Sequence, residues 1–175
     1  MHVRPVLIVT ALLSTVVGPF GPGMSAGDAA STSGNSVSGG GLALTSLSPI
    51  GPLNFGLGVT GNTDGTNVHG EITITDPLTS APLAQVTVHA TCLIVQPGRD
   101  GGLVAVTGGT VVVSTGAFAN LLHRGDRVFV KAFEAAAGST PAQDAINSTD
   151  GCIGVTVPPE FNPVVSGSIH ITQRT

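Results

Sequence analysis

Residues 85–95, QVTVHATCLIV, decide the fold. Small apolar residues alternate with threonine and histidine from Val86 to Thr91. Successive side chains of a β-strand point to opposite faces, so this period of two predicts a strand with one buried face. The sequence PGRDGG at 97–102 predicts the turn that ends the strand.

The same alternation recurs on both sides of this stretch. Residues 68–75, VHGEITIT, stop at an Asp-Pro turn, and residues 127–134, RVFVKAFE, alternate again. Further strands are expected at 42–47, 53–60, 103–106, 110–115, 152–157 and 164–172, with a bulge at 108–109. A loop is expected over 132–145, because Gly138 and Pro141 interrupt any helix there. About seven to nine strands without crossover helices predict an all-β fold, an antiparallel β-sandwich of immunoglobulin-like or jelly-roll outline.

The N-terminal residues 1–31 have the order of a secretory signal peptide. Arg4 precedes the apolar run Val6–Val17, which is followed by small residues. The run is much shorter than the roughly 20 residues needed to span a bilayer, so no permanent membrane anchor is expected. Cleavage after Ser25, Ala26, Ala29 or Ser31 fits the small residues, and the sequence leaves these sites open. We therefore expect a secreted protein, extracellular or associated with the cell surface.

The remainder of the chain is expected to be a Gly/Ser-rich flexible tether, residues 32–41, and a single domain, residues 42–175. Only 9% of the residues are charged and the net charge is −4, which excludes nucleic acid as a partner. The chain has neither Trp nor Tyr, so aromatic stacking on sugars or single strands is not expected from these residue types.

Two cysteines, Cys92 and Cys152, predict one disulfide bond in an exported chain. The alternative is a pair of buried free thiols. Closing a loop of this length contributes about 3–5 kcal/mol in the chain-entropy model.

Three histidines, His69, His89 and His170, occupy polar positions of their expected strands, and Glu71 lies two residues from the first. If those strands are neighbours in one sheet, these four side chains converge on one face and bind zinc or copper. The alternative is a set of exposed histidines on a threonine-rich face with no metal, and no other cofactor is expected.

No catalytic residues are assigned. The chain has no Gly-x-Ser-x-Gly nucleophile motif, and acids beside turn glycines, such as Asp64-Gly65, are explained as turn residues. Paired carboxylates from any two of Asp64, Asp76, Asp126 and Glu134 require a spatial meeting that the sequence does not show. The residues therefore favour a protein that is not an enzyme.

From about Gly41 to Thr172 the chain resembles a family of uncharacterised secreted β-domain proteins of actinobacteria. The matching segments are residues 70–76, 90–95, 108–109, 125–130, 150–152 and 166–171. Residues 134–138, EAAAG, stand where the family carries an acidic turn. The resemblance implies a β fold and export, and no established activity.

Three functions follow as hypotheses. The first is a non-enzymatic exported interaction module whose partner is an unknown protein or cell-envelope component. The second is a metal-binding protein or metalloenzyme that uses the strand histidines. The third is a structural or self-assembling envelope protein, favoured by the low charge and the valine- and threonine-rich strands.

Overall fold

The computed structural model describes residues 34–44, 52–78, 84–98, 101–136, 145–153 and 162–174. The chain divides into two compact units, Met1–Ala30 and Ser31–Thr175, and all described residues belong to the second. The expected signal peptide and its cleavage site therefore lie outside the described residues. Within the described ranges, no helix is long and apolar enough to cross a membrane.

The described part of the chain is all-β, as predicted. Its eight strands are β1 (Gly34–Ala43), β2 (Leu53–Asn62), β3 (His69–Thr75), β4 (Gln85–Pro97), β5 (Leu103–Thr115), β6 (Arg127–Glu134), β7 (Ala145–Thr149) and β8 (Asn162–Thr172). A short 3-10 helix, η2 (Gly116–Asn120), follows β5. Most strand positions were predicted, but β7 falls just after the segment expected to be a loop and was missed.

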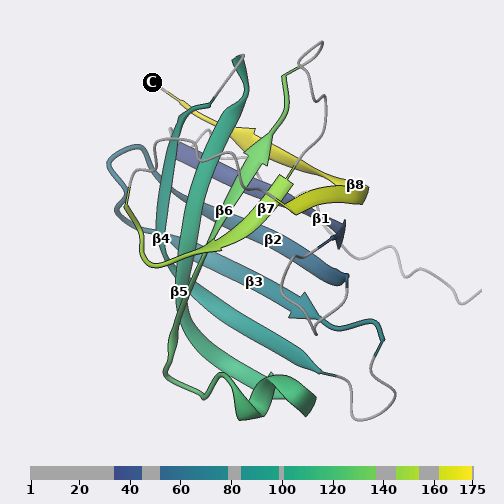
Figure 1. Cartoon of the computed structure of the whole chain (residues 1–175). Helices are drawn as coiled ribbons and strands as arrows, with labels where there is room; N and C mark the ends of the chain where they lie inside the picture. The colour runs from purple at the N-terminus through teal and green to yellow at the C-terminus, as the bar shows by residue number, and fades with distance from the viewer. Residues whose placement is uncertain are drawn as a thin grey trace, which may run out of the picture. The chain divides into compact units, whose positions relative to one another are not determined.

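The strands form one strongly curled antiparallel sheet instead of the two sheets of a sandwich (Figure 1). Each strand pairs with the next, and β1 also pairs with β8, from Ser36 opposite Thr172 to Ala43 opposite Val164. The ring of pairings closes into a barrel at β7 and β8, where two residue pairs meet among the described residues. Alternation with a period of two indicates that each strand has one buried face. It does not indicate which strands pair, so it is compatible with both a sandwich and a barrel.

The tether expected at 32–41 is wrong for Gly34–Gly41, which lie in β1. Val37 in this strand has no exposed surface. A Cβ atom on Gly39 would collide with the carbonyl oxygen of Ser168 on β8, and Gly39 has a φ of 139°. Glycine is needed here for close approach of two strands, although its abundance in sequence is typical of a linker.

A bulge also differs from its expected place. β5 continues through Gly108 and Gly109, and the extra residue is Thr91 on β4, between the pairs Ala90 with Gly109 and Cys92 with Gly108. The glycines make room for this bulge, because a Cβ atom on Gly109 would collide with the backbone of β4. The strand expected at 152–157 is not present at Cys152 and Ile153, and its other residues lie outside the described ranges.

Apolar side chains fill the inside of the barrel. Several of them are almost fully buried, and six of these are called the packed interior here: Val37, Val59, Ile72, Val88, Leu93 and Ile169. They come from β1 to β4 and from β8, so the core forms only when the sheet curls and brings β8 to β1.

The predicted disulfide joins Cys92 to Cys152, whose Cα atoms are 6.3 Å apart. Cys92 lies on β4 at the outer surface of the sheet, paired with Gly108, which in turn faces Phe129 on β6. Val104, Val106 and Phe129 are buried on the same surface, outside the core cluster of the barrel interior. The disulfide thus ties the segment after β7 to the outer face of β4.

Candidate functional site

Of the four residues predicted to bind metal, the structure brings two together. Glu71 on β3 is directly opposite His89 on β4, and the His89 Nε2 atom lies 2.9 Å from Glu71 Oε1. Both side chains are more than half exposed. This is an ordinary cross-strand pair on a solvated face.

The other two histidines have separate partners. His69 Nε2 lies 2.9 Å from Thr60 Oγ1, and its Nδ1 lies 3.0 Å from the carbonyl oxygen of Asn67. His170 is on β8, with β1 and β2 between it and β3, which is roughly 14 Å at about 4.8 Å per strand. No group of three or more His, Cys, Asp or Glu able to hold a metal is found among the described residues. Binding of zinc or copper by these side chains stays a prediction.

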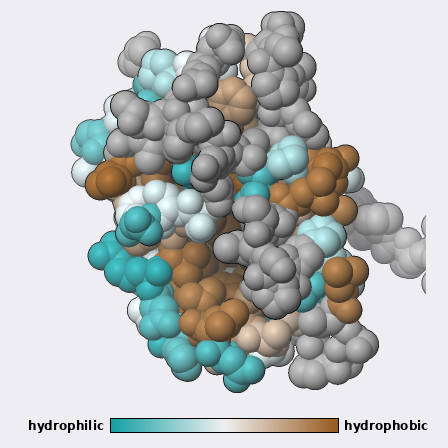
Figure 2. All heavy atoms as spheres, viewed as in Figure 1, coloured by the Kyte–Doolittle hydropathy of each residue, from teal (hydrophilic) through white to brown (hydrophobic). Residues whose placement is uncertain are grey.

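An apolar pocket of about 380 Å³ opens at the end of the barrel where β1, β3 and β5 end, called the apolar end here. Its apolar lining comes from seven segments: Ala43; Leu53 and Phe55; Ile74; Val86; Phe118, Leu121 and Leu122; Val128, Phe129 and Val130; and Ile146. Figure 2 shows hydrophobic atoms gathered in a recess on one face of the molecule, above the region of η2 in Figure 1. The volume is within the range of small-molecule sites.

Strand alternation and η2 together build this lining. Phe55, Ile74 and Val86 follow one another in register across β2, β3 and β4, all on the inner face. Phe118 on η2 is 7% exposed and belongs to the same core cluster, so the short helix closes one side of the pocket.

The loop after η2 is held by hydrogen bonds. The backbone N–H groups of Leu121 and Leu122 both donate to the carbonyl of Phe118, at 2.9 and 2.8 Å. The Asp126 carbonyl accepts from the Val111 N–H at 2.8 Å, and the Asp126 carboxylate accepts from the His123 N–H at 2.7 Å. These hydrogen bonds hold the loop that carries Leu121 and Leu122 at one wall of the pocket.

Polar groups are few in the pocket. Arg127, Ser148, Thr149 and Asn162 are the polar residues of its lining. The Arg127 guanidinium carbon lies 5.1 Å from the centre of the Phe129 ring, a cation–π distance. Of the described residues that line the pocket, none is acidic.

Exposed leucines surround the same end. Leu44 follows β1, Leu78 follows β3 and Leu121 follows η2, and each is nearly half exposed or more. Three separate connections at one end of the barrel thus present apolar side chains to solvent. A single exposed leucine needs no explanation, but several around one apolar opening indicate a binding surface.

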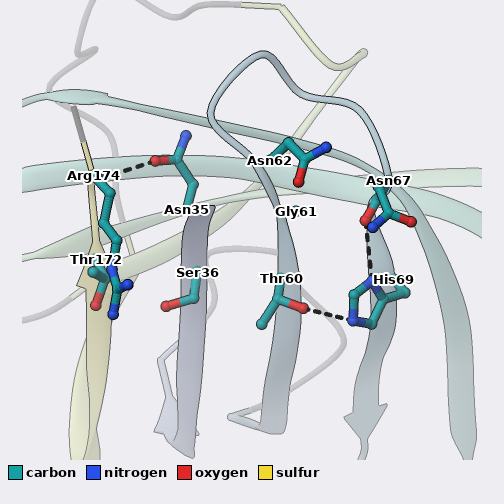
Figure 3. A pocket seen from close by; sticks show the side chains of 10 residues that line it. Asn35, Ser36, Thr60, Gly61, Asn62, Asn67, His69, Thr172 and Arg174 are labelled. Atoms are coloured by element: carbon teal, nitrogen blue, oxygen red, sulfur yellow. Dashed lines mark hydrogen bonds between the residues drawn. The ribbon is translucent and has the colours of Figure 1, made fainter. Parts of the chain in front are cut away.

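A second, polar groove of about 260 Å³ lies beside the opposite end, called the polar end here. Thr172, Ser36, Thr60 and His69 form one row across β8, β1, β2 and β3 (Figure 3). The Asn35 side-chain oxygen accepts a hydrogen bond from the Arg174 backbone N–H at 3.2 Å. This groove has hydroxyl and amide groups where the apolar pocket has hydrocarbon.

Fold and pocket define a class: an antiparallel barrel with an apolar cavity at one end and a polar surface at the other. Comparison of the chain with known protein families, curated proteins and solved structures finds no match in any of the three. The resemblance to secreted actinobacterial β-domain proteins stays a prediction.

Sequence reasoning missed the apolar pocket. Its lining residues are valine, leucine, isoleucine and phenylalanine, the types that fill any core. They come from segments spread from Ala43 to Asn162. The one sequence signal that could have indicated this pocket is the apolar pair Leu121 and Leu122, close to Arg124 and Arg127.

Proposed function

We propose that this protein is an exported, non-enzymatic binding protein for one small apolar molecule, held in the apolar pocket. The observation that carries the proposal is the 380 Å³ cavity, whose lining is predominantly hydrocarbon. An eight-stranded barrel is wide enough for its side chains to fill or for one small ligand. In this protein the packed interior fills one part of the barrel, and the apolar pocket occupies another part.

Binding at this site is driven by removal of apolar surface from water, at roughly 25 cal/mol for each Å² buried. The described lining residues include no carboxylate, imidazole, thiol or amine side chain that could serve as a general acid or base. This keeps the non-enzymatic role expected from the sequence and replaces an unspecified partner with a small molecule. The disulfide supports a place outside the cytoplasm.

The test is calorimetric titration of the folded domain with two neutral probes, decanol and naphthalene. We expect at least one probe to bind one per chain. Ala43→Leu, which adds bulk to the lining, is expected to weaken that binding at least tenfold, because the side chain occupies the space of the probe. Ala119→Leu is the matched control, since Ala119 is exposed on η2 and outside the lining.

Two results would contradict the proposal. One is the absence of binding by either probe. The other is an equal loss of binding in both leucine variants, because that would show a nonspecific surface effect. Circular dichroism of each variant verifies that it is folded.

A further inference from the structure

We infer that the ligand of the apolar pocket is an amphiphile with a carboxylate head, which binds Arg127 while its hydrocarbon part lies inside the barrel. This inference rests on the proposed function and adds the chemical class of the ligand. It follows from the position of one positive charge on an otherwise apolar lining.

The charge on the described lining is positive. Arg127 is the only charged residue among the described lining residues. The nearest acid along the chain, Asp126, accepts the His123 N–H at 2.7 Å and lies 3.6 Å from the His123 ring. A neutral or cationic ligand makes no use of the Arg127 charge, whereas an anionic head is attracted by it.

The position of the guanidinium suits a head group at the rim. Arg127 opens β6 and is exposed, and its guanidinium lies over the Phe129 ring, which itself lines the pocket. Because the Phe129 ring is on the outer surface of the sheet, the guanidinium lies on the outer side of the pocket rim. Thr149, opposite Phe129 on β7, adds a hydroxyl to the same part of the lining.

The chemistry favours a carboxylate in particular. A guanidinium presents two parallel N–H donors that match the two oxygens of a carboxylate. The apolar lining from Phe55 to Val130 then contacts the hydrocarbon part of the ligand, while Arg127 contacts its carboxylate. The polarity of the pocket thus sets the orientation of its ligand, with the head outward and the hydrocarbon inward.

The experiment compares three probes with one hydrocarbon chain and different heads: decanoate, decanol and decylamine, titrated at pH 7. We expect decanoate to bind about tenfold tighter than decanol, and decylamine to bind more weakly than either. Arg127→Gln is expected to reduce decanoate binding to about the level of decanol, and to change decanol binding much less than decanoate binding.

Two variants complete the design. Arg124→Gln is the matched control, because Arg124 is an exposed arginine of the same loop that does not line the pocket, and decanoate binding should change less than twofold. Arg127→Lys keeps the charge and loses the two parallel donors, so it should recover only part of the preference.

The outcomes separate the two proposals. If decanol binds as tightly as decanoate and Arg127→Gln changes neither, the inference is wrong and the proposed function stands. If none of the three probes and no naphthalene binds, the proposed function itself fails. Equal loss of decanoate binding in Arg124→Gln and Arg127→Gln would also overturn the inference, because it would show attraction by the loop as a whole.

Discussion

The two ends of the barrel are bounded by the same strands, yet the interior is filled toward one end and hollow at the other. On β3, Ile72 belongs to the packed interior and is fully buried, while Ile74 lines the apolar pocket and is partly exposed. Positions two residues apart on one strand therefore differ, because one is packed inside the protein and the other borders the pocket. Alternation alone therefore does not decide whether an inward side chain packs against other side chains or borders a cavity.

The connections at the two ends differ in the same way. At the apolar end they present Leu44, Leu78 and Leu121 to solvent. At the polar end the β2–β3 connection is held by its own polar groups, with the Thr66 hydroxyl and N–H both donating to the Asp64 carboxylate at 2.6 and 2.9 Å. The apolar end thus presents hydrocarbon to solvent, whereas polar groups of the β2–β3 connection at the polar end hydrogen-bond to one another.

The largest effect is expected from truncating the packed interior. Ile72→Ala should lower the free energy of unfolding by about 2–5 kcal/mol, because it leaves a cavity in a closely packed region. Ile74→Ala is the matched control and should cost clearly less, since its side chain already borders open space. Urea denaturation of both variants measures the difference. Equal losses would show that the pocket is as tightly packed as the rest of the interior.

The next largest effect is expected from removing a hydrogen bond between β6 and β8, near the place where the barrel closes. Glu134 at the end of β6 accepts the Ile171 N–H of β8 at 2.6 Å, beyond the short pairing of β7 with β8. Glu134→Ala should cost about 1.5–3 kcal/mol, the range for a hydrogen bond to a charged group. Glu134→Gln keeps an acceptor oxygen and should cost less. If His170→Ala, which removes the 3.5 Å contact between the His170 ring and the Glu134 carboxylate, costs as much as Glu134→Ala, the backbone hydrogen bond is not the important contact.

A smaller effect is expected from adding volume at each end. Ala105→Leu, at a fully buried position of the core, should destabilise the fold by about 1–3 kcal/mol through overpacking. Ala43→Leu should change stability by less than about 1 kcal/mol, because the added carbons enter the pocket. Thermal and urea unfolding of the pair give the measurement. A large loss in Ala43→Leu would mean that the cavity does not accommodate added atoms.

The smallest effect is a pH dependence at the polar end. Hydrogen bonds from the Thr66 side chain, and then from its backbone N–H, lower the pKa of the Asp64 carboxyl below its usual range. A lowered pKa contributes stability above the pKa of the unfolded chain, near pH 4, and this contribution is lost as pH falls through the folded value.

Removal of the Thr66 hydroxyl tests this assignment. In Thr66→Val, the pKa of Asp64, followed by NMR, should rise toward the ordinary value of an aspartate side chain. An unchanged titration would show that the hydroxyl is not the main cause. The Asp64→Asn variant should differ from the parent in stability at neutral pH and converge with it in acid.

Much of the strand pattern was predictable, and the failures have identifiable causes. Residues 68–75, 85–95 and 127–134 alternate strictly and were placed within one or two residues of β3, β4 and β6. Residues Gly34–Gly41 of β1 were missed because the glycines, required by the approach of β8, have the composition of a linker, whereas Leu42 and Ala43 fall in the strand expected at 42–47. β7 was missed because it has five residues and follows a segment rich in alanine.

The candidate site was not predictable in the same way. The four metal-ligand candidates were found by residue type, but strand order separates His170 from Glu71 and His89. The pocket residues carry no unusual type or spacing, and only the joining of β1 to β8 brings Ala43, Val86 and Ile146 around one cavity.

Alternation, composition and two cysteines by themselves determined an all-β chain with one buried face per strand and one disulfide. These properties depend on local geometry and on residue chemistry, which are carried by short segments. Only the tertiary structure decided that the sheet closes on itself, that its interior stays open at one end, and that Arg127 stands at the rim of the opening. Those features depend on contacts between residues far apart in the chain, and no local pattern records them.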